Sequence, residues 1–269
     1  MSNLVQRTLS GSVYVAVIVS AILYHPLSFT ILFCLVAALT AREFCKLLKL
    51  DSWLTVFASV AAGVLFLSRS YLQDSTVSGL FHYIYFFLIL FVLVAELFRK
   101  QPDPIRNWGN FLASQAMIAY PLALINDIYF HQEWSVGKYI ALALFVCVWA
   151  NDTGAYLTGS LIGKHKMIPR VSPGKTWEGL IGGFIFSLVA GYIFFLCIPE
   201  LALWKWLLIA FTISVAGTLG DLMESLFKRT IGIKDSGNVV PGRGGWLDCF
   251  DSTLLASPAV YALLILVLG

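Results

Sequence analysis

The chain has 269 residues, of which 59% are hydrophobic and only 12% are Asp, Glu, Lys or Arg. An ordinary soluble domain carries about 25% charged residues, and so apolar a chain could not cover its surface with polar groups. This composition excludes a disordered chain, a coiled coil and a small disulfide scaffold, and it argues against a soluble enzyme. The formal net charge of +3 is too small to indicate nucleic acid as a partner.

Nine apolar stretches follow one another along the chain, and none contains Asp, Glu, Lys or Arg. They are residues 8–24, 27–41, 52–68, 75–95, 107–126, 139–151, 179–199, 206–220 and 252–269. A helix needs about 20 residues to cross a bilayer core about 30 Å thick, so we expect the shorter stretches to extend into their flanks. Lipid offers no partner for exposed backbone groups, which requires each span to be helical. The pattern predicts an all-α polytopic membrane protein with about nine transmembrane helices.

The loop charges indicate an orientation for these nine spans. With the N-terminus in the cytoplasm, the outer segments hold only Arg69, Lys138 and Lys205 of the 18 Lys and Arg residues, and the cytoplasmic segments hold the other 15. This split follows the positive-inside rule. We therefore expect a cytoplasmic N-terminus and an external C-terminus.

Polar residues divide the chain into two regions. Residues 1–135 have short loops and Leu-, Phe-, Ala- and Val-rich spans, which indicates a transmembrane scaffold. Residues 136–269 add two cytoplasmic loops, 158–178 and 221–251, that concentrate Gly, Pro, Lys and Asp. Loops of this kind commonly carry function, so we expect a catalytic region here.

The first loop follows an acidic residue and a run of glycines. Asp152 lies near the cytoplasmic end of the sixth span, where an ionisable group is a candidate functional residue. A carboxylate paired with a Lys at the interface is the alternative. Gly154, Gly159 and Gly163 recur at near-helical spacing, which fits either close helix packing or the approach of a substrate.

The end of the first loop has two possible roles. Thr176 and Glu178 could cap the seventh span at its N-terminus. Alternatively, Ser172, Lys175 and the helix N-terminus could form an anion cradle, because backbone N–H groups and the helix dipole favour phosphate there. The residue types do not separate these two interpretations.

The second loop begins with a carboxylate at the end of the eighth span. Asp221 at a helix C-terminus is unfavourable with respect to the helix dipole, so a metal ion or a Lys should offset its charge. Glu224 and Lys228 are four residues apart and can share a helix face, either in a site or as a plain surface pair.

Two further carboxylates stand at the start of the ninth span. Asp251 has a structural alternative as an N-cap before Ser252, whereas Asp248 has none. Together with Asp152 and Asp221 they lie near one membrane face, where carboxylates repel one another unless a cation sits between them. Hard oxygen ligands suit Mg²⁺, which usually shares its shell with substrate phosphates. The region therefore indicates a phosphorylated substrate and a divalent metal.

Both segments resemble the phosphatidate cytidylyltransferase family, also called CDP-diacylglycerol synthases. The family signature runs Ser-x-x-Lys-Arg, Lys-Asp, a Gly/Pro turn and Asp-Arg-x-Asp. The matching residues are Ser225, Lys228, Arg229, Lys234, Asp235, Pro241, Gly242, Gly244, Gly245, Asp248 and Asp251, with Gly220, Asp221, Asp152 to Tyr156, Ser172, Pro173 and Lys175 to Gly179 in the earlier motifs. Two positions depart, because Arg243 stands where the family usually has His and Cys249 where it usually has Arg.

The resemblance implies that CTP and phosphatidate give CDP-diacylglycerol and pyrophosphate, in phospholipid biosynthesis at the cell membrane, with the active site facing the cytoplasm. It also implies Mg²⁺ and a possible homodimer. On this hypothesis Asp221 and Asp248 ligate Mg²⁺, with support from Asp251 or Asp152. The expected catalytic residues are Asp221, Asp248, Lys228, Arg229 and Lys234, of which the three cations would hold the phosphates. The expected substrate-binding residues are Ser172, Lys175, Thr176, Glu178, Ser225, Asp235 and Arg243.

Three alternatives stay open at this point. Another CTP-dependent transferase could use an isoprenoid or ether-lipid phosphate. A polytopic transporter would need charged residues near the centres of several spans, where this chain has none. The departures at Arg243 and Cys249 also allow a catalytically weak relative.

Overall fold

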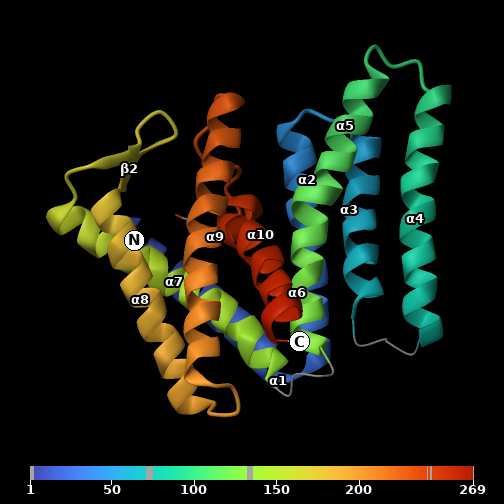
Figure 1. Cartoon of the computed structure of the whole chain (residues 1–269). Helices are drawn as coiled ribbons and strands as arrows, with labels where there is room; N and C mark the ends of the chain where they lie inside the picture. The colour runs from blue at the N-terminus through green and yellow to red at the C-terminus, as the bar shows by residue number, and fades with distance from the viewer. Residues whose placement is uncertain (1–2, 71–74, 132–135, 241, 243, 269) are drawn as a thin grey trace. The chain divides into compact units, whose positions relative to one another are not determined.

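The computed structural model describes residues 3–70, 75–131, 136–240, 242 and 244–268 (Figure 1). The chain forms two compact units. The first contains residues 1–130 and 235–249, and the second contains residues 131–234 and 250–269. The predicted division at residue 135 stays a prediction, and the glycine-rich segment 235–249 groups by its contacts with the N-terminal unit. Sequence order alone could not show this return of the chain.

The first unit is built from helices whose starts are set by local capping. His25 caps the second helix by accepting a hydrogen bond from the Leu27 N–H at 3.1 Å, and Pro26 occupies the first helical position. Asp51 caps the third helix through the Leu54 N–H at 2.9 Å. The elements are α1 (Asn3–Tyr24), α2 (Pro26–Leu47), α3 (Ser52–Ser68), α4 (Ser75–Phe98), α5 (Pro104–Ser114), the π-helical turn η1 (Gln115–Ala119) and α6 (Tyr120–Phe130).

The second unit joins long helices to a short hairpin. In it α7 packs extensively against α8, and α8 packs against α9. The strands pair antiparallel, with Lys166 opposite Thr176 and Ile168 opposite Ser172. The elements are α7 (Gly137–Ile162), β1 (Lys166–Ile168), β2 (Ser172–Thr176), α8 (Trp177–Cys197), α9 (Leu203–Thr230), α10 (Trp246–Leu263) and the π-helical turn η2 (Leu264–Leu268). The helix α10 runs from residues of the first unit into residues of the second.

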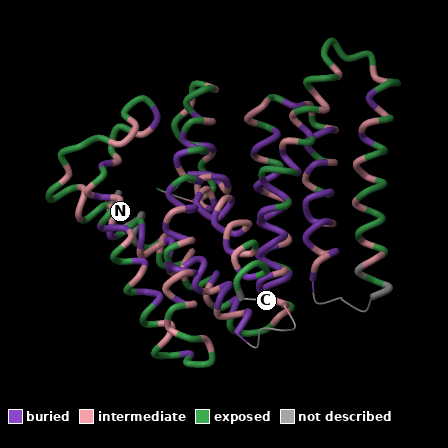
Figure 2. Tube along the Cα trace, viewed as in Figure 1, coloured by how far each residue is buried: buried purple, intermediate pink, exposed green. Residues whose placement is uncertain are grey.

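The nine apolar stretches all fall on helices or helical runs of the described chain. Seven of these helices are long and apolar enough to cross a membrane, and two shorter apolar helices lie at Leu9–Tyr24 and Ser52–Ser68. Large apolar side chains also face outward, for example Phe87 (64% exposed) on α4 and Ile181 (58%) on α8. Figure 2 shows this exposure along α4. Such surfaces are unfavourable in water and expected in lipid, so the chain is an all-α polytopic membrane protein.

The two predicted cytoplasmic loops are shorter than expected. The helix α7 continues to Ile162, α9 continues to Thr230 and α10 already begins at Trp246. Much of the predicted loops 158–178 and 221–251 is therefore helical, and the described residues that are not helical are 163–176, 231–240, 242, 244 and 245. The apolar stretches end earlier than the helices because a helix that leaves the lipid needs no further apolar residues.

Glycines allow α7 and α8 to approach closely. A Cβ atom on Gly154 would lie 2.7 Å from Cβ of Phe186 and 2.8 Å from the backbone oxygen of Gly182. Gly182 and Gly183 on α8 face Thr158 and Asn151 of α7 in the same way. For Gly154, the helix-packing alternative is confirmed.

We expect Gly154→Ala to destabilise the protein by about 1–3 kcal/mol, because the added methyl group meets backbone that cannot move away at little cost. Thermal unfolding of the detergent-purified protein measures this change. Gly109→Ala is the matched control: Gly109 is exposed on α5 and has no atom within 4 Å of an added Cβ. Equal melting temperatures for the two variants would contradict the packing argument.

Candidate functional site

A cavity of about 430 Å³ lies within the second unit, between α7, the hairpin, α8 and α9. Four residues expected at the site line this cavity: Asp152, Lys175, Thr176 and Asp221. The structure thus brings together side chains from both polar segments of the sequence. Other polar lining residues are Asn151, Tyr156, Ser160 and Thr218.

An ion pair joins the two walls of the cavity. Lys175 Nζ on β2 lies 2.6 Å from Oδ2 of Asp221 on α9, and both side chains are about a quarter exposed (26% and 28%). Lys175 also donates to the Thr218 backbone oxygen at 3.4 Å, and Ser225 Oγ donates to Oδ1 of Asp221 at 3.2 Å. Asp221 does not end its helix as predicted, but the prediction that a cation offsets its charge is confirmed, with Lys175 as that cation.

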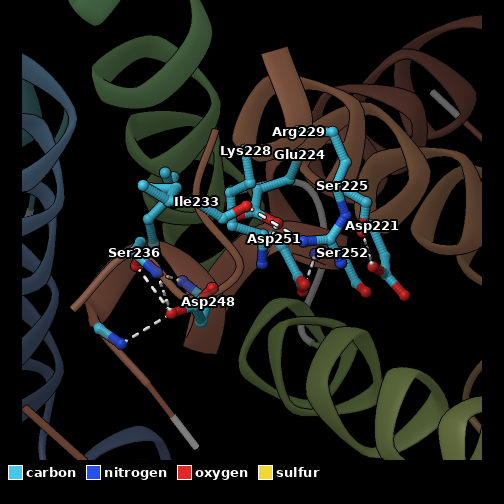
Figure 3. Close-up of polar contacts among 12 residues, drawn as sticks. Asp221, Glu224, Ser225, Lys228, Arg229, Ile233, Ser236, Asp248, Asp251 and Ser252 are labelled. Atoms are coloured by element: carbon cyan, nitrogen blue, oxygen red, sulfur yellow. Dashed lines mark hydrogen bonds and ion pairs between the residues drawn. The ribbon is translucent and has the colours of Figure 1, made fainter. Parts of the chain in front are cut away.

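Asp251 belongs to the same acidic group. It lies in the second turn of α10, so the N-cap alternative is wrong: the helix begins five residues earlier, at Trp246. The Asp251 carboxylate is half-buried, accepts a hydrogen bond from the Ser252 N–H, and lies close enough to Asp221, Glu224 and Asp152 for electrostatic repulsion. Figure 3 shows Asp221, Glu224 and Asp251. Three of the four predicted carboxylates are therefore neighbours.

Glu224 and Lys228 form an ion pair inside the protein. Lys228 Nζ lies 2.6 Å from Oε2 of Glu224, and their side chains are 10% and 3% exposed. The surface-pair alternative is wrong, because this face of α9 is buried. The next residue, Arg229, is exposed and donates from a guanidinium nitrogen to the Ile233 backbone oxygen at 3.0 Å, which holds the chain where it leaves α9.

Hydrogen bonds at the start of α8 hold the hairpin β1–β2 in place. Thr176 Oγ1 accepts from the Gly179 N–H at 3.1 Å, so its predicted capping role is confirmed. The Glu178 carboxylate accepts from the Lys164 N–H at 3.1 Å and from the His165 N–H at 3.2 Å, and it lies 2.6 Å from His165 Nδ1. Ser172 is half-buried at the start of β2, opposite Ile168.

Asp248 has a structural role that the sequence did not suggest. Its Oδ2 accepts from the Ser236 N–H, Ser236 Oγ and the Gly245 N–H, each at 2.8 Å (Figure 3). The contact with Gly245 is the reciprocal half of a capping box, in which an acidic residue in the first turn reaches back to the N-cap amide. Asp248 lies in the first unit, as does Asp235, which is exposed together with the preceding Lys234. Arg243 and Pro241 lie outside the described residues.

Two residues whose hydrogen bonds hold these segments in place were not identified from the sequence. Asn151 is buried beside the cavity, donates to Thr218 Oγ1 at 3.3 Å and accepts from Ser214 Oγ, which ties α7 to α9. Its signal was an amide in an otherwise apolar span directly before Asp152. Glu43 on α2 accepts from the Trp246 N–H at 2.9 Å and the Leu247 N–H at 3.0 Å. In the sequence Glu43 is a single acidic residue in a basic connecting segment. No sequence pattern relates it to Trp246 and Leu247, which lie 203 and 204 positions later.

The described residues contain no group of three or more His, Cys, Asp or Glu side chains arranged to hold a metal ion. Mg²⁺ needs no such cage, because it is usually held by one or two carboxylates and completes its shell with water and substrate phosphates. Carboxylate oxygens such as those of Asp221 and Asp152 are of the type that Mg²⁺ prefers, and Asp251 lies close enough to both to be repelled by their charge.

Comparisons with known proteins identify the family of this chain. A sequence profile of the cytidylyltransferase family matches residues 5–267. The chain is 42% identical over 162 residues to a protein of Staphylococcus saprophyticus and 43% identical over 162 residues to one of Staphylococcus haemolyticus, both named phosphatidate cytidylyltransferase. A protein of the same name from Staphylococcus aureus is 41% identical over 163 residues. Each match covers 60% of this chain, and the chain spans 62% of the length of these relatives. With nearly its whole length matched by the family profile, this chain belongs to the cytidylyltransferase family.

Proposed function

We propose that the protein is a CTP:phosphatidate cytidylyltransferase, which makes CDP-diacylglycerol and pyrophosphate in phospholipid biosynthesis. The observation that carries this proposal is the cavity of the second unit, where the Lys175–Asp221 ion pair stands beside Asp152. A cation and carboxylates on facing walls suit a substrate that brings phosphate groups and a metal ion together. The family membership supports the same nucleotide, CTP.

The proposed reaction joins two polyanions. A phosphatidate oxygen attacks the α-phosphorus of CTP, and the bond between that phosphorus and the bridging oxygen breaks as pyrophosphate leaves. No general base is required, because phosphatidate is already an anion. Repulsion between the reactants is the main obstacle, so fixed positive charge supplies most of the catalysis.

The protein's own cations supply part of that charge. Lys175 lies on the cavity wall, and we propose that it contacts the phosphates of CTP. Lys228, Arg229 and Lys234 are proposed to bind the triphosphate and the phosphatidate headgroup, with hydrogen bonds from Ser172 and Ser225. Asn151 and Thr218 hold α7 and α9 at a fixed spacing, which keeps the two walls in place.

Mg²⁺ is the metal that the acidic group suits. We propose that Asp221 holds it, with Asp152 or Asp251 in support, and that it would supply charge neutralisation at the phosphates. The sequence hypothesis that Asp248 is a further ligand stays a prediction. Its Oδ2 already accepts three hydrogen bonds in the first unit.

The membrane arrangement is part of the same proposal. We propose nine spans, a cytoplasmic N-terminus, and a site that faces the cytoplasm of the cell membrane, supported by the distribution of Lys and Arg over the loops. The acyl chains of phosphatidate would then stay in lipid while the headgroup reaches the cavity. A homodimer through the spans also stays a proposal.

Asp221→Asn and Lys175→Met should each lower kcat about 10²- to 10³-fold, because each removes a fixed charge at the reacting phosphates. The measurement is CDP-diacylglycerol formation from labelled CTP, phosphatidate and Mg²⁺ by the purified protein. Glu200→Gln, in the turn before α9, and Lys205→Met, in its first turn, are matched charge controls, and both should retain wild-type turnover. Near-normal activity of Asp221→Asn would remove Asp221 from the site.

A substrate panel separates this proposal from its alternatives. Phosphatidate should be converted faster than an isoprenyl phosphate or an ether-lipid phosphate at equal concentration in mixed micelles. Preference for an isoprenyl phosphate would identify a different lipid-phosphate transferase. Failure of the purified protein to release pyrophosphate from CTP with any lipid would indicate a transporter or an inactive relative.

Chelation of divalent ions tests whether the reaction requires Mg²⁺. EDTA should abolish turnover, and added Mg²⁺ should restore it, because the carboxylates alone increase the negative charge that the substrates meet. Isothermal titration of Mg²⁺ into the protein with CTP bound provides a reading that does not depend on turnover. Full activity after exhaustive chelation would exclude a required divalent ion.

A further inference from the structure

Glu43 caps a helix that begins about 200 residues later in the chain. It stands on α2, in the part of the sequence interpreted as scaffold, and accepts hydrogen bonds from the first two amides of α10, those of Trp246 at 2.9 Å and Leu247 at 3.0 Å. These amides lack partners within their own helix. The positive end of the helix dipole also favours a carboxylate at this position.

The residue before α10 explains why the capping carboxylate is supplied by α2 and not by the N-cap residue itself. An N-cap side chain normally accepts from the second or third amide of its helix, here that of Leu247 or Asp248, but Gly245 has no side chain. A Cβ atom at Gly245 would overlap Oε1 of Glu43 and Oγ of Ser236. The glycine is therefore required by the close approach of Glu43.

The same carboxylate reaches the segment that precedes α10. Ser236 Oγ donates to Oε1 of Glu43, and the buried Ser236 also contacts Asp248 through both its N–H and its hydroxyl group. Gly237 is also close, because a Cβ atom there would lie 3.2 Å from Oε2 of Glu43. Glu43, Ser236 and Asp248 thus form one hydrogen-bonded cluster that fixes both ends of the segment 236–248.

We propose that Glu43 is a positioning residue for the reaction: it holds the glycine-rich segment 236–248 and the start of α10, and thereby orients Asp248. The catalytic part of this inference rests on the proposed function, whereas the structural part does not. Glu43 would act through the segment and would not touch the substrates.

Hydrogen exchange of the detergent-purified full chain tests the structural part. In Glu43→Ala the peptide covering residues 235–249 should exchange about tenfold faster than in the wild type, because charge-assisted hydrogen bonds to its amides are lost. Glu43→Gln keeps the shape and one acceptor oxygen, so its effect should be smaller. This variant also serves if Glu43→Ala does not fold.

Glu96→Gln is the matched control in the same unit. Glu96 is 1% exposed and accepts hydrogen bonds from Arg99 and Asn107, away from the 236–248 segment. It should lower the melting temperature without changing either exchange at residues 235–249 or kcat. Glu43→Ala should instead lower kcat about tenfold or more and leave KM for CTP nearly unchanged, since positioning acts on the reacting geometry.

A double variant measures the coupling directly. Gly245→Ala should strongly lower activity when Glu43 is present, and less in the Glu43→Ala background, where Ser236 Oγ remains near the added methyl group but the Glu43 carboxylate is gone. Unchanged exchange at residues 235–249 in both Glu43 variants would overturn the inference, as would equal acceleration by Glu96→Gln. Faster exchange with an unchanged kcat would overturn its catalytic part. A wild-type protein without cytidylyl transfer would instead refute the proposed function, and the exchange result would still stand.

Discussion

A carboxylate surrounded by apolar helices is stable only when an opposite charge or several hydrogen-bond donors replace its lost hydration. Three carboxylates of the described residues illustrate this constraint. Asp221 pairs with Lys175, and Glu224 pairs with Lys228. Glu96 accepts from Arg99 and Asn107. Because the partners usually stand on different elements, charge compensation also decides which elements are joined.

The same constraint explains why the polar and charged side chains of the site lie at the ends of the apolar stretches. The hairpin that follows α7 returns Lys175 to the side of α9, and the resulting ion pair forms one boundary of the cavity. Thr176 and Glu178 then fix the start of α8 and the base of the hairpin. The walls of the cavity are therefore fixed by the capping of α8 and by the ion pair of Asp221 on α9. Glycines allow α7 and α8, which form two of these walls, to pack closely.

Much of this architecture follows from the sequence because lipid leaves the backbone few choices. Hydropathy located all nine helical stretches, and motif spacing located Asp152, Lys175 and Asp221. Helix ends were less predictable: the apolar stretch ends at Gly220, but α9 continues to Thr230, and Lys175 offsets the charge of Asp221 within it. The role of Glu43 could not be predicted for another reason. Its partners lie 203 and 204 positions away in the chain, and a single Glu in a basic segment has the pattern of a surface charge.

The Lys175–Asp221 pair also constrains how substrates and cations would bind in the proposed reaction. If Lys175 turned toward a phosphate, Asp221 would lose its partner while it still faced repulsion from Asp251. That state is unfavourable unless another cation reaches Asp221, so the binding of phosphate by Lys175 and of a cation by Asp221 should strengthen each other. By thermodynamic linkage the strengthening is equal in both directions. In the proposed reaction, the Lys175–Asp221 ion pair would therefore favour the joint binding of nucleotide and cation over the binding of either alone.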